Sequence, residues 1–171
     1  AINATGGNDT FQGVLGTLIV KVFELHVGKV GLSEREAVKE GFQIASALVP
    51  AGDKAHYYPG TRDIIIKLIA DKTTKKLLGA EIVGEGVVDK RIDIIATALT
   101  FGATVDQVSK LDLAYAPPYA MSMDAVIVAA NVLGNKLSGK TMGILPHEVA
   151  ERLDRGEDFV LLDVRTEMEY Q

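Results

Sequence analysis

The strongest constraint on the fold is a pair of apolar segments joined by a polar turn. Residues 61–70 alternate between apolar and polar side chains, which is the period of a half-buried strand. The apolar side chains that share one face of this segment are Ile64, Ile66 and Leu68. Polar residues fill 71–76, and residues 77–83 are again mostly apolar. The two segments therefore predict an antiparallel hairpin with one face turned toward a core.

Helical segments follow this hairpin. The apolar positions of residues 88–101 recur at helical spacing and form one stripe, made by Ile92, Ile95, Ala96 and Leu99. The polar side chains of this helix are expected largely on its other faces: Asp89, Lys90, Arg91, Asp93 and Thr97. Residues 124–133 are apolar almost all round, so this helix must be buried inside the domain or against another subunit.

Sequence signals for helix ends accompany these segments. Ser33 and Glu36 form a capping box, in which each side chain satisfies the other residue's free backbone N–H. The helix that they begin should end at Gly41. Gly102 should end the helix after the hairpin, and Thr104 should cap a further short helix.

Further strands are predicted before the hairpin. Apolar residues dominate 13–30 and predict a strand, with Gly28 and Gly31 marking a bend or an exit. Residues 42–49 predict another strand, which Pro50 should end. The chain therefore predicts an α+β fold, in which helices cover a mixed, mainly antiparallel sheet.

A new pattern of predicted elements begins after a linker at 134–140, which is rich in Gly, Ser, Asn and Lys. Residues 146–154 predict an amphipathic helix, 155–158 a turn and 159–164 a strand. A lone helix and strand bury too little surface to offset the entropy lost on ordering them. We therefore expect the truncated start of a second domain.

Composition excludes several classes of chemistry. The 171 residues contain no cysteine, which excludes disulfides, thiolate metal sites and a cysteine nucleophile within them. The net charge is −5 without a run of Lys or Arg, so nucleic acid is not an expected partner. The apolar stretch 14–23 contains Lys21 and is too short to span a bilayer, and no secretion signal is recognisable. We therefore expect a cytoplasmic protein without membrane partners.

Neither a metal site nor a nucleotide loop is predicted. His26, His56 and His147 lack the spacing of metal ligands. Gly84–Gly86 follows a strand and precedes a helix, as a dinucleotide-binding loop does, but Asp89 stands where that motif has its third glycine. A glycine turn between strand and helix is the better interpretation.

Four of the five tyrosines lie in two proline-bearing segments, His56–Gly60 and Ala114–Tyr119. Proline restrains the backbone, so a tyrosine on such a loop loses little further conformational entropy when its phenol forms a hydrogen bond. The phenol could donate a hydrogen bond to an anion such as a departing thiolate. The alternative is that these tyrosines cover the edge of the core or an interface, and the residues alone favour this alternative.

Six motifs occur in one order along the chain: Phe11–Thr17 with Lys21–Phe23, Gly31–Ala37, the segment around Tyr57, Leu78–Gly84, Asp89–Asp93 and Tyr115–Tyr119. Together they resemble the dimerisation domain of the pyridine nucleotide-disulfide oxidoreductases over roughly residues 1–134. The resemblance is greatest to the branch of coenzyme A-disulfide reductases, NADH oxidases and persulfide reductases. Residues 161–170 resemble the first strand of a rhodanese domain, and this fusion points to coenzyme A disulfides or persulfides rather than oxygen.

The resemblance implies a domain organisation. Residues 1–10 would be the tail of an upstream FAD-binding domain, 11–134 the dimerisation domain, 135–142 a linker and 143–171 a truncated, α/β rhodanese-like start. FAD and NAD(P)H would bind upstream domains of the same polypeptide. Coenzyme A would be the substrate or a bound thiol of the parent enzyme. None of these groups is expected to be held by this chain alone.

The resemblance also implies roles for the tyrosine loops in a homodimer. The redox cysteine would lie upstream, and Tyr57 and Tyr115 would support catalysis at the partner subunit's cysteine. Tyr58 and Tyr119 would contact the substrate. Two prolines, Pro117 and Pro118, would lie near the flavin. The alternatives are an NADH oxidase within the same family, and a stand-alone dimerisation or scaffold module without a redox role.

Overall fold

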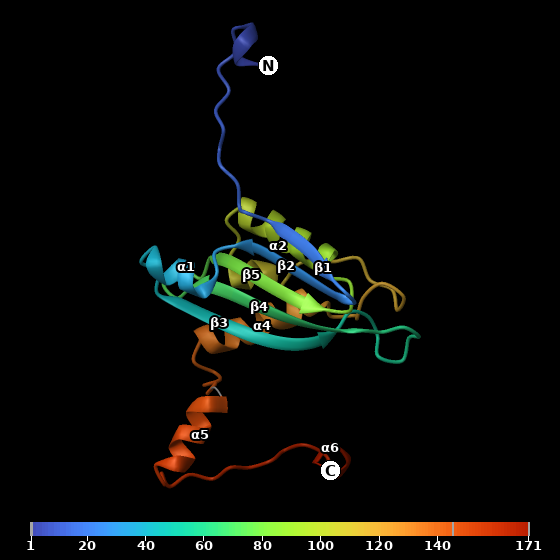
Figure 1. Cartoon of the computed structure of the whole chain (residues 1–171), viewed down its shortest axis with the longest axis vertical. Helices are drawn as coiled ribbons and strands as arrows, with labels where there is room; N and C mark the ends of the chain where they lie inside the picture. Colours follow the sequence, from blue (N-terminus) through green and yellow to red (C-terminus); the bar gives the residue numbers. More distant parts are fainter. Residues whose placement is uncertain (1, 145, 171) are drawn as a thin grey trace. The chain divides into compact units, whose positions relative to one another are not determined.

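The computed structural model describes residues 2–144 and 146–170, which belong to two compact units. The first unit spans Ala1–Thr141 and the second Met142–Gln171. A five-stranded sheet with the strand order β1-β2-β5-β4-β3 forms the centre of the first unit (Figure 1). Its strands are β1 (Leu18–Val22), β2 (Leu25–Gly31), β3 (Ile44–Gly52), β4 (Asp63–Asp71) and β5 (Leu77–Gly84). All neighbouring strands in this sheet pair antiparallel, so the α+β class is confirmed and the sheet is antiparallel throughout.

Helices cover one face of this sheet. The helices of the first unit are η1 (Asn3–Thr5), α1 (Glu34–Lys39), α2 (Asp89–Thr100), α3 (Val105–Val108) and α4 (Ala125–Leu137). In Figure 1, α2 and α4 lie behind the sheet, and α1 lies at one end of it. No helix within residues 2–144 and 146–170 is long and apolar enough to cross a membrane.

The predicted hairpin of residues 61–83 is confirmed as β4 and β5. Ile66 pairs with Ile82 and Leu68 with Ala80, and all four side chains are buried. The Asp71 carboxylate organises the turn, because it accepts hydrogen bonds from the backbone N–H groups of Thr73 and Thr74 and from the Thr74 hydroxyl. The alternation therefore identified the face of β4 on which the core is built.

Helix α4 is buried within its own domain. It packs against β3 and β4, and its fully buried side chains are Ala125, Val126, Ala129, Ala130 and Leu133. Small residues on this face allow the helix to lie close to the sheet. Of the two burial modes that the sequence allowed, the structure shows packing inside the domain.

The strand predicted across 13–30 is wrong, because the structure has two strands there. β1 and β2 form a tight hairpin in which Val22 pairs with Leu25, and Phe23 has a φ of 54° at the turn. The turn lacks the Gly, Asn or Asp that usually marks such a hairpin, so the apolar run reads as continuous. Gly28 makes no bend: it is buried in β2, and an added Cβ would overlap with Ile92 of α2.

Pro50 does not end its strand, which corrects another prediction. β3 continues to Gly52, and Pro50 pairs in register with Ile65 of β4. β3 is an edge strand of the sheet. A proline is tolerated on an edge because its missing N–H can face away from the ladder.

The predictions for the last part of the chain are partly confirmed. The helix predicted at 146–154 is α5 (Pro146–Asp154), and a short α6 (Glu167–Tyr170) follows. The linker expected from residue 134 is wrong at its start, because α4 stays helical through Leu137. Residues 159–164 form no strand, because a strand needs a neighbour to share hydrogen bonds and none of the described residues pairs with them.

The predicted helix ends are confirmed. Ser33 and Glu36 form a complete capping box, and Thr104 forms a second one with Gln107. Gly41 and Gly102, which follow α1 and α2, have φ values of 89° and 64°. These left-handed conformations are adopted readily by glycine, which explains why the helices end there.

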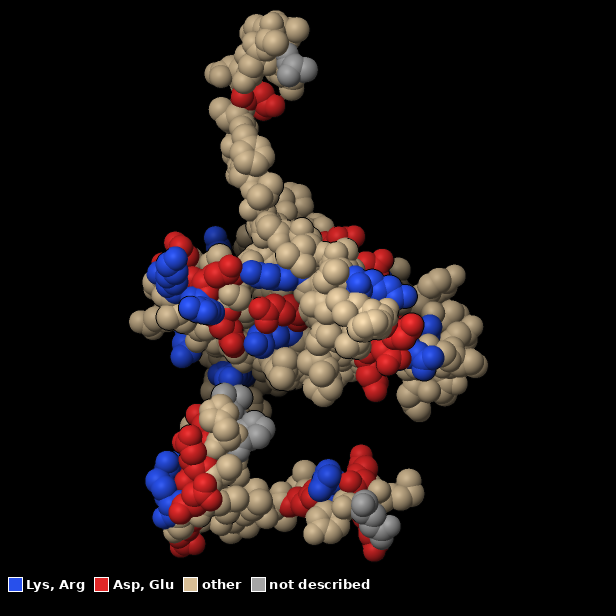
Figure 2. Space-filling model, viewed as in Figure 1, with Lys and Arg blue, Asp and Glu red and all other residues tan. Residues whose placement is uncertain are grey.

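The face of the sheet opposite α2 and α4 has a charged part and an apolar part. Figure 2 shows Lys and Arg side chains beside Asp and Glu side chains near α1. The ion pairs there join Lys29 to Glu36, and Lys67 to both Glu34 and Glu81. The exposed apolar side chains of the β1–β2 hairpin on this face and at its turn are Leu18, Val20, Val22, Phe23 and Leu25.

Glu36 gives α1 a measurable pH dependence. Its carboxylate accepts hydrogen bonds from Lys29 Nζ, the Ser33 backbone N–H and the Ser33 hydroxyl, each over 2.7 Å. These bonds, with that of Lys29 first, lower the pKa of Glu36 from 4.5 to about 2. Because folding favours the ionised carboxylate, its stabilising contribution is complete above pH 4.5 and is lost as the pH falls toward about 2.

We predict that Glu36→Gln is less stable than the wild type at neutral pH, and that this difference shrinks as the pH falls from 4.5 to about 2. Urea unfolding at a series of pH values measures the difference in free energy. Lys29→Met removes the strongest of the hydrogen bonds and should move the transition to higher pH. A stability difference that stays constant over this range would contradict the assignment.

Candidate functional site

The four predicted tyrosines lie on two surface segments of the first unit. Tyr57 and Tyr58 lie on the loop between β3 and β4, and Tyr115 and Tyr119 lie between α3 and α4. The side chains of Tyr57, Tyr115 and Tyr119 are 66%, 51% and 71% exposed. These phenols therefore do not cover the core within this chain, and they are available to a ligand or to another protein surface.

The first segment, residues 53–62, is named the first tyrosine loop. It is closed at its base, where the Asp53 N–H donates to the Arg62 carbonyl over 2.8 Å. Further along the loop, the Thr61 hydroxyl oxygen lies 2.7 Å from the carbonyl oxygens of both Ala55 and Tyr58. Tyr57 and Tyr58 are thus carried on a loop with internal hydrogen bonds rather than on a loose connection.

The Asp53 carboxylate joins this loop to the turn between β5 and α2. It accepts the N–H of Arg62 over 2.9 Å and the N–H of Val87 over 3.3 Å, and it is 2% exposed. Gly86 is required beside it, because an added Cβ would lie 2.6 Å from Asp53 Cβ. Gly86 therefore makes room for Asp53, which supports a glycine turn rather than a nucleotide loop.

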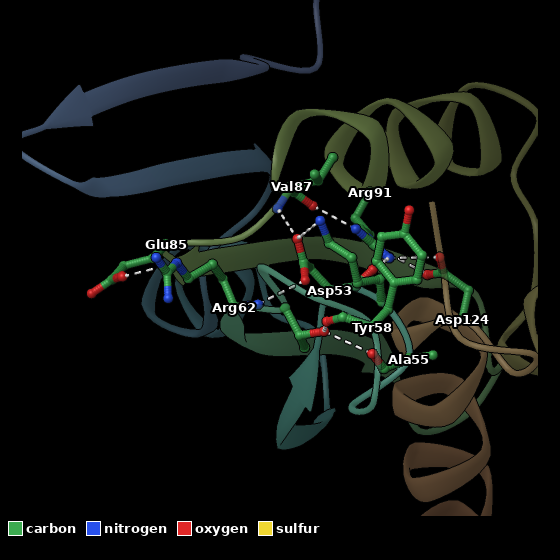
Figure 3. A network of polar contacts seen from close by, with 10 residues as sticks. Asp53, Ala55, Tyr58, Arg62, Glu85, Val87, Arg91 and Asp124 are labelled. Carbon is green, nitrogen blue, oxygen red and sulfur yellow. Dashed lines mark hydrogen bonds and ion pairs between the residues drawn. The ribbon is translucent and has the colours of Figure 1, made fainter. Parts of the chain in front are cut away.

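The buried guanidinium of Arg91 is the centre of the site (Figure 3). It donates to the Asp53 carbonyl over 2.6 Å and to the Val87 carbonyl over 2.8 Å. Two further bonds, of 2.9 and 3.3 Å, reach the carboxylate of Asp124, which is also buried. A charge in the interior is stable only when it is paired and hydrogen bonded, and Arg91 satisfies both conditions.

The position of Arg91 corrects the prediction that placed it on a polar face of its helix. Arg91 is 0% exposed and belongs to the buried stripe of α2. The signal was present in the spacing, because residue 91 lies three positions after Val88 and four before Ile95, both fully buried. The residue type indicated an exposed position instead, since arginine is almost never fully buried unless it is paired.

The second segment, residues 114–124, is named the second tyrosine loop. A turn closes at Ala116, whose carbonyl accepts the N–H of Tyr119 over 2.8 Å. The loop ends at Asp124, which caps α4 by accepting the N–H of Val126 over 3.1 Å. Arg91 therefore contacts the last residue of the second tyrosine loop as well as the first residue of the first.

A mostly apolar hollow of about 470 Å³ lies beside the second tyrosine loop. Its lining residues are Val87, Lys90, Ala114, Tyr115, Ala116, Pro118 and Tyr119. The Lys90 ammonium lies 3.5 Å from the Asp124 carboxylate and is the only charged group of the lining within the described residues. The hollow thus offers two phenols and one cation to a ligand that carries an anion on an apolar body.

The structure brings some of the predicted residues together and leaves others apart. Tyr115, Tyr119 and Pro118 share the hollow. Tyr57 and Tyr58 do not line it, and neither does the half-buried Pro117. Sequence reasoning missed the buried network that joins the two loops. Within residues 2–144 and 146–170, no group of His, Cys, Asp and Glu side chains could hold a metal ion.

We predict that Asp53→Ala destabilises the chain by about 1–3 kcal/mol, because two partly buried backbone N–H groups lose the carboxylate that accepts from them. Asp53→Asn retains one acceptor and should cost less. Chemical denaturation measures both changes. Asp63→Ala, an exposed aspartate at the start of β4, is the matched control and should change stability by less than about 0.5 kcal/mol. If the alanine variants at positions 53 and 63 lost the same free energy of unfolding, the role of Asp53 would be contradicted.

Comparisons with known proteins identify the family of this chain. Residues 17–127 match the family described as pyridine nucleotide-disulphide oxidoreductase, dimerisation domain. A Pyrococcus furiosus NAD(P)H sulfur oxidoreductase (CoA-dependent) is 47% identical over 131 residues, which are 77% of this chain and 29% of that protein. A Staphylococcus haemolyticus coenzyme A disulfide reductase is 36% identical over 75% of this chain and 28% of its own length.

A solved structure shows the same fold. The NAD-dependent persulfide reductase of A. fulgidus superposes with a TM-score of 0.81 at 45% sequence identity. The matched part is 84% of this chain and 26% of the reductase chain. The chain therefore spans less than a third of the length of the relatives it matches. By its sequence and its fold, the chain belongs to the pyridine nucleotide-disulphide oxidoreductase family and contains the dimerisation domain of that family.

Proposed function

We propose that this chain is part of an FAD-dependent NAD(P)H:disulfide oxidoreductase that reduces coenzyme A disulfide or a coenzyme A persulfide. The single observation that carries the proposal is the pair of exposed tyrosine loops, both held by Arg91. The relatives support the substrate class, because two of them are described as acting on coenzyme A disulfide or as coenzyme A-dependent.

The chain's part in this reaction is to supply phenols. When a disulfide is reduced, a thiolate leaves and needs a hydrogen bond or a proton. The phenols of Tyr57 and Tyr115 can donate to that thiolate, and Tyr58 and Tyr119 would contact the body of the substrate. The chain has no cysteine, so the redox cysteine would lie elsewhere in the polypeptide.

FAD would pass electrons from NAD(P)H to the disulfide when it is bound to the parent enzyme, and its site is expected in an upstream domain. In the glycine turn after β5, Asp53 lies close to Gly86 and accepts the Val87 N–H, which favours a structural role for this turn. Pro118 is exposed at the rim of the hollow, which is compatible with a place near a flavin held by another part of the protein. Pro117 is half-buried beside it.

We propose a homodimer in which the tyrosine loops of each chain lie beside the redox cysteine of the partner subunit. Dimerisation is the defining property of the matched family. The exposed apolar side chains of the β1–β2 hairpin further support a contact with additional protein surface.

Residues 143–171 are proposed to begin a rhodanese-like domain that follows the dimerisation domain of 11–134. The resemblance of residues 161–170 to the first rhodanese strand carries this proposal, and the contacts after α5 are local ones. The Asp163 carboxylate pairs with Arg165 over 2.6 Å, and the Glu169 carboxylate accepts hydrogen bonds from the N–H and the hydroxyl of Thr166. Residues 1–10 are proposed to end an FAD-binding domain, and the linker would begin after α4, at residue 138, rather than at 135.

We predict that Tyr57→Phe combined with Tyr115→Phe, made in the full-length protein, lowers kcat for coenzyme A disulfide by about 100-fold, because the leaving thiolate loses its donors. Steady-state kinetics with saturating NAD(P)H measure the loss. Tyr170→Phe is the matched control, because Tyr170 is the one tyrosine outside the two loops. Unchanged turnover in the double variant would show that the tyrosines have a structural role only.

A mixed dimer tests whether the tyrosines act across subunits. One subunit carries Ser in place of the redox cysteine and wild-type tyrosines, and the other carries the cysteine with Phe at positions 57 and 115. If the tyrosines act on the partner, the mixed dimer contains one complete site and recovers about half of the wild-type turnover. Each variant paired with itself is the control. No recovery on mixing would mean that the loops serve their own subunit.

A further inference from the structure

The two tyrosine loops are remote in sequence and meet at one side chain. The first loop begins at Asp53, whose carbonyl accepts an Arg91 N–H over 2.6 Å. The second loop ends at Asp124, whose carboxylate accepts two Arg91 N–H groups over 2.9 and 3.3 Å. These residues lie 38 positions before and 33 positions after Arg91. The guanidinium therefore holds the ends of both loops at once (Figure 3).

The contacts use the flat, forked geometry of a guanidinium. The Nη2 atom alone donates to both loops, while Nη1 donates to the Val87 carbonyl on the turn before α2. A lysine ammonium is a single point charge and cannot repeat these directions. Because Arg91 and Asp124 are 0% and 3% exposed, water does not substitute for a lost bond without opening the core.

The targets of these bonds show what Arg91 does beyond stabilising the core. An apolar side chain of similar size often packs in the interior as well as a buried ion pair does. The Arg91 bonds, however, go to loop ends and to a turn rather than to the strands or helices that form the core. Arg91 thus fixes where the first tyrosine loop begins and where the second one ends.

We propose that Arg91 is a positioning residue, which sets the distance between the two tyrosine loops so that Tyr57 and Tyr115 reach the same leaving thiolate together. Asp53 and Asp124 are its partners on the two loops. The inference rests on the proposed function, because it assigns a common task to phenols whose role has still to be measured. A displacement of about 1 Å at a reacting group can reduce the rate by about 100-fold, so small shifts of either loop matter.

A structural experiment tests the coupling without reference to activity. In the full-length protein, Arg91→Lys should increase backbone hydrogen exchange in residues 54–62 and 114–123 together, although the two segments are far apart in sequence. Asp124→Asn keeps an acceptor for the N-cap of α4 but loses the ion pair, and it should give the same pattern to a smaller degree. Ile95→Ala is the matched control, since Ile95 is fully buried on the same helix and its side chain has no group that could hydrogen bond to the network. Exchange that rises in only one loop, or as much in Ile95→Ala, would overturn the proposal.

A kinetic cycle tests whether Arg91 acts through the tyrosines. Arg91→Lys should lower kcat for coenzyme A disulfide by about tenfold, with the KM for NAD(P)H and the rate of flavin reduction unchanged. When Arg91→Lys is added to the Tyr57→Phe, Tyr115→Phe double variant, kcat should fall by less than about twofold further, because the groups that it positions are already gone.

The outcomes of this cycle are distinct. If the double variant is impaired and the added Arg91→Lys lowers kcat by a further tenfold, Arg91 acts independently and the inference fails while the proposed function stands. If the double variant has full turnover, the catalytic role proposed for the tyrosines fails, and the inference that Arg91 positions them for catalysis fails with it, while the reduction of coenzyme A disulfide stands. If Arg91→Lys lowers Tm as Ile95→Ala does but leaves kcat unchanged, Arg91 is structural only and the inference is overturned.

Discussion

The hydrogen bonds of the buried Arg91 guanidinium are the interaction on which the arrangement of the two tyrosine loops depends. A full charge inside the core must find partners for its N–H groups, and the partners within reach are the carbonyls of Asp53 and Val87 and the carboxylate of Asp124. All three lie at the ends of connections rather than inside regular elements. The cost of leaving this charge unpaired therefore forces the two tyrosine loops and the turn before α2 into one arrangement.

The antiparallel sheet makes this arrangement possible, because it fixes where those connections start. The first tyrosine loop joins β3 to β4, and the turn before α2 leaves β5, which is the neighbour of β4. Glycine permits the close approach at two places: Gly28 under Ile92 lets α2 lie on the sheet, and Gly86 leaves room for Asp53. The same packing that buries the apolar faces of β4 and α2 thus brings Arg91 to the base of both loops.

The chain contains only some of the groups that its family's reaction would need. The chain has no cysteine, yet it presents four tyrosines on two braced loops, and the second of these loops lines a mostly apolar hollow with one lysine. Such a surface suits a ligand that arrives with its own reactive group, held by a second protein surface. A rigid presentation is useful in that setting, because phenols that are already oriented lose little entropy when the partner approaches.

The sequence by itself determined the elements whose signals are local: the period of β4 and β5, the stripe of α2, the capping boxes at Ser33 and Thr104, and the presence of the tyrosines on proline-bearing loops. Only the tertiary structure decided that Arg91 is buried, that residues 18–31 fold back at Phe23, and that 159–164 form no strand. The physical reason is that periodicity and capping act between residues a few positions apart. The burial of a charge and the joining of two loops instead depend on groups that the sequence places more than thirty positions apart, which only the fold brings into contact. The hairpin of β1 and β2 is local, but its turn at Phe23 lacks the residue types that usually mark such a turn.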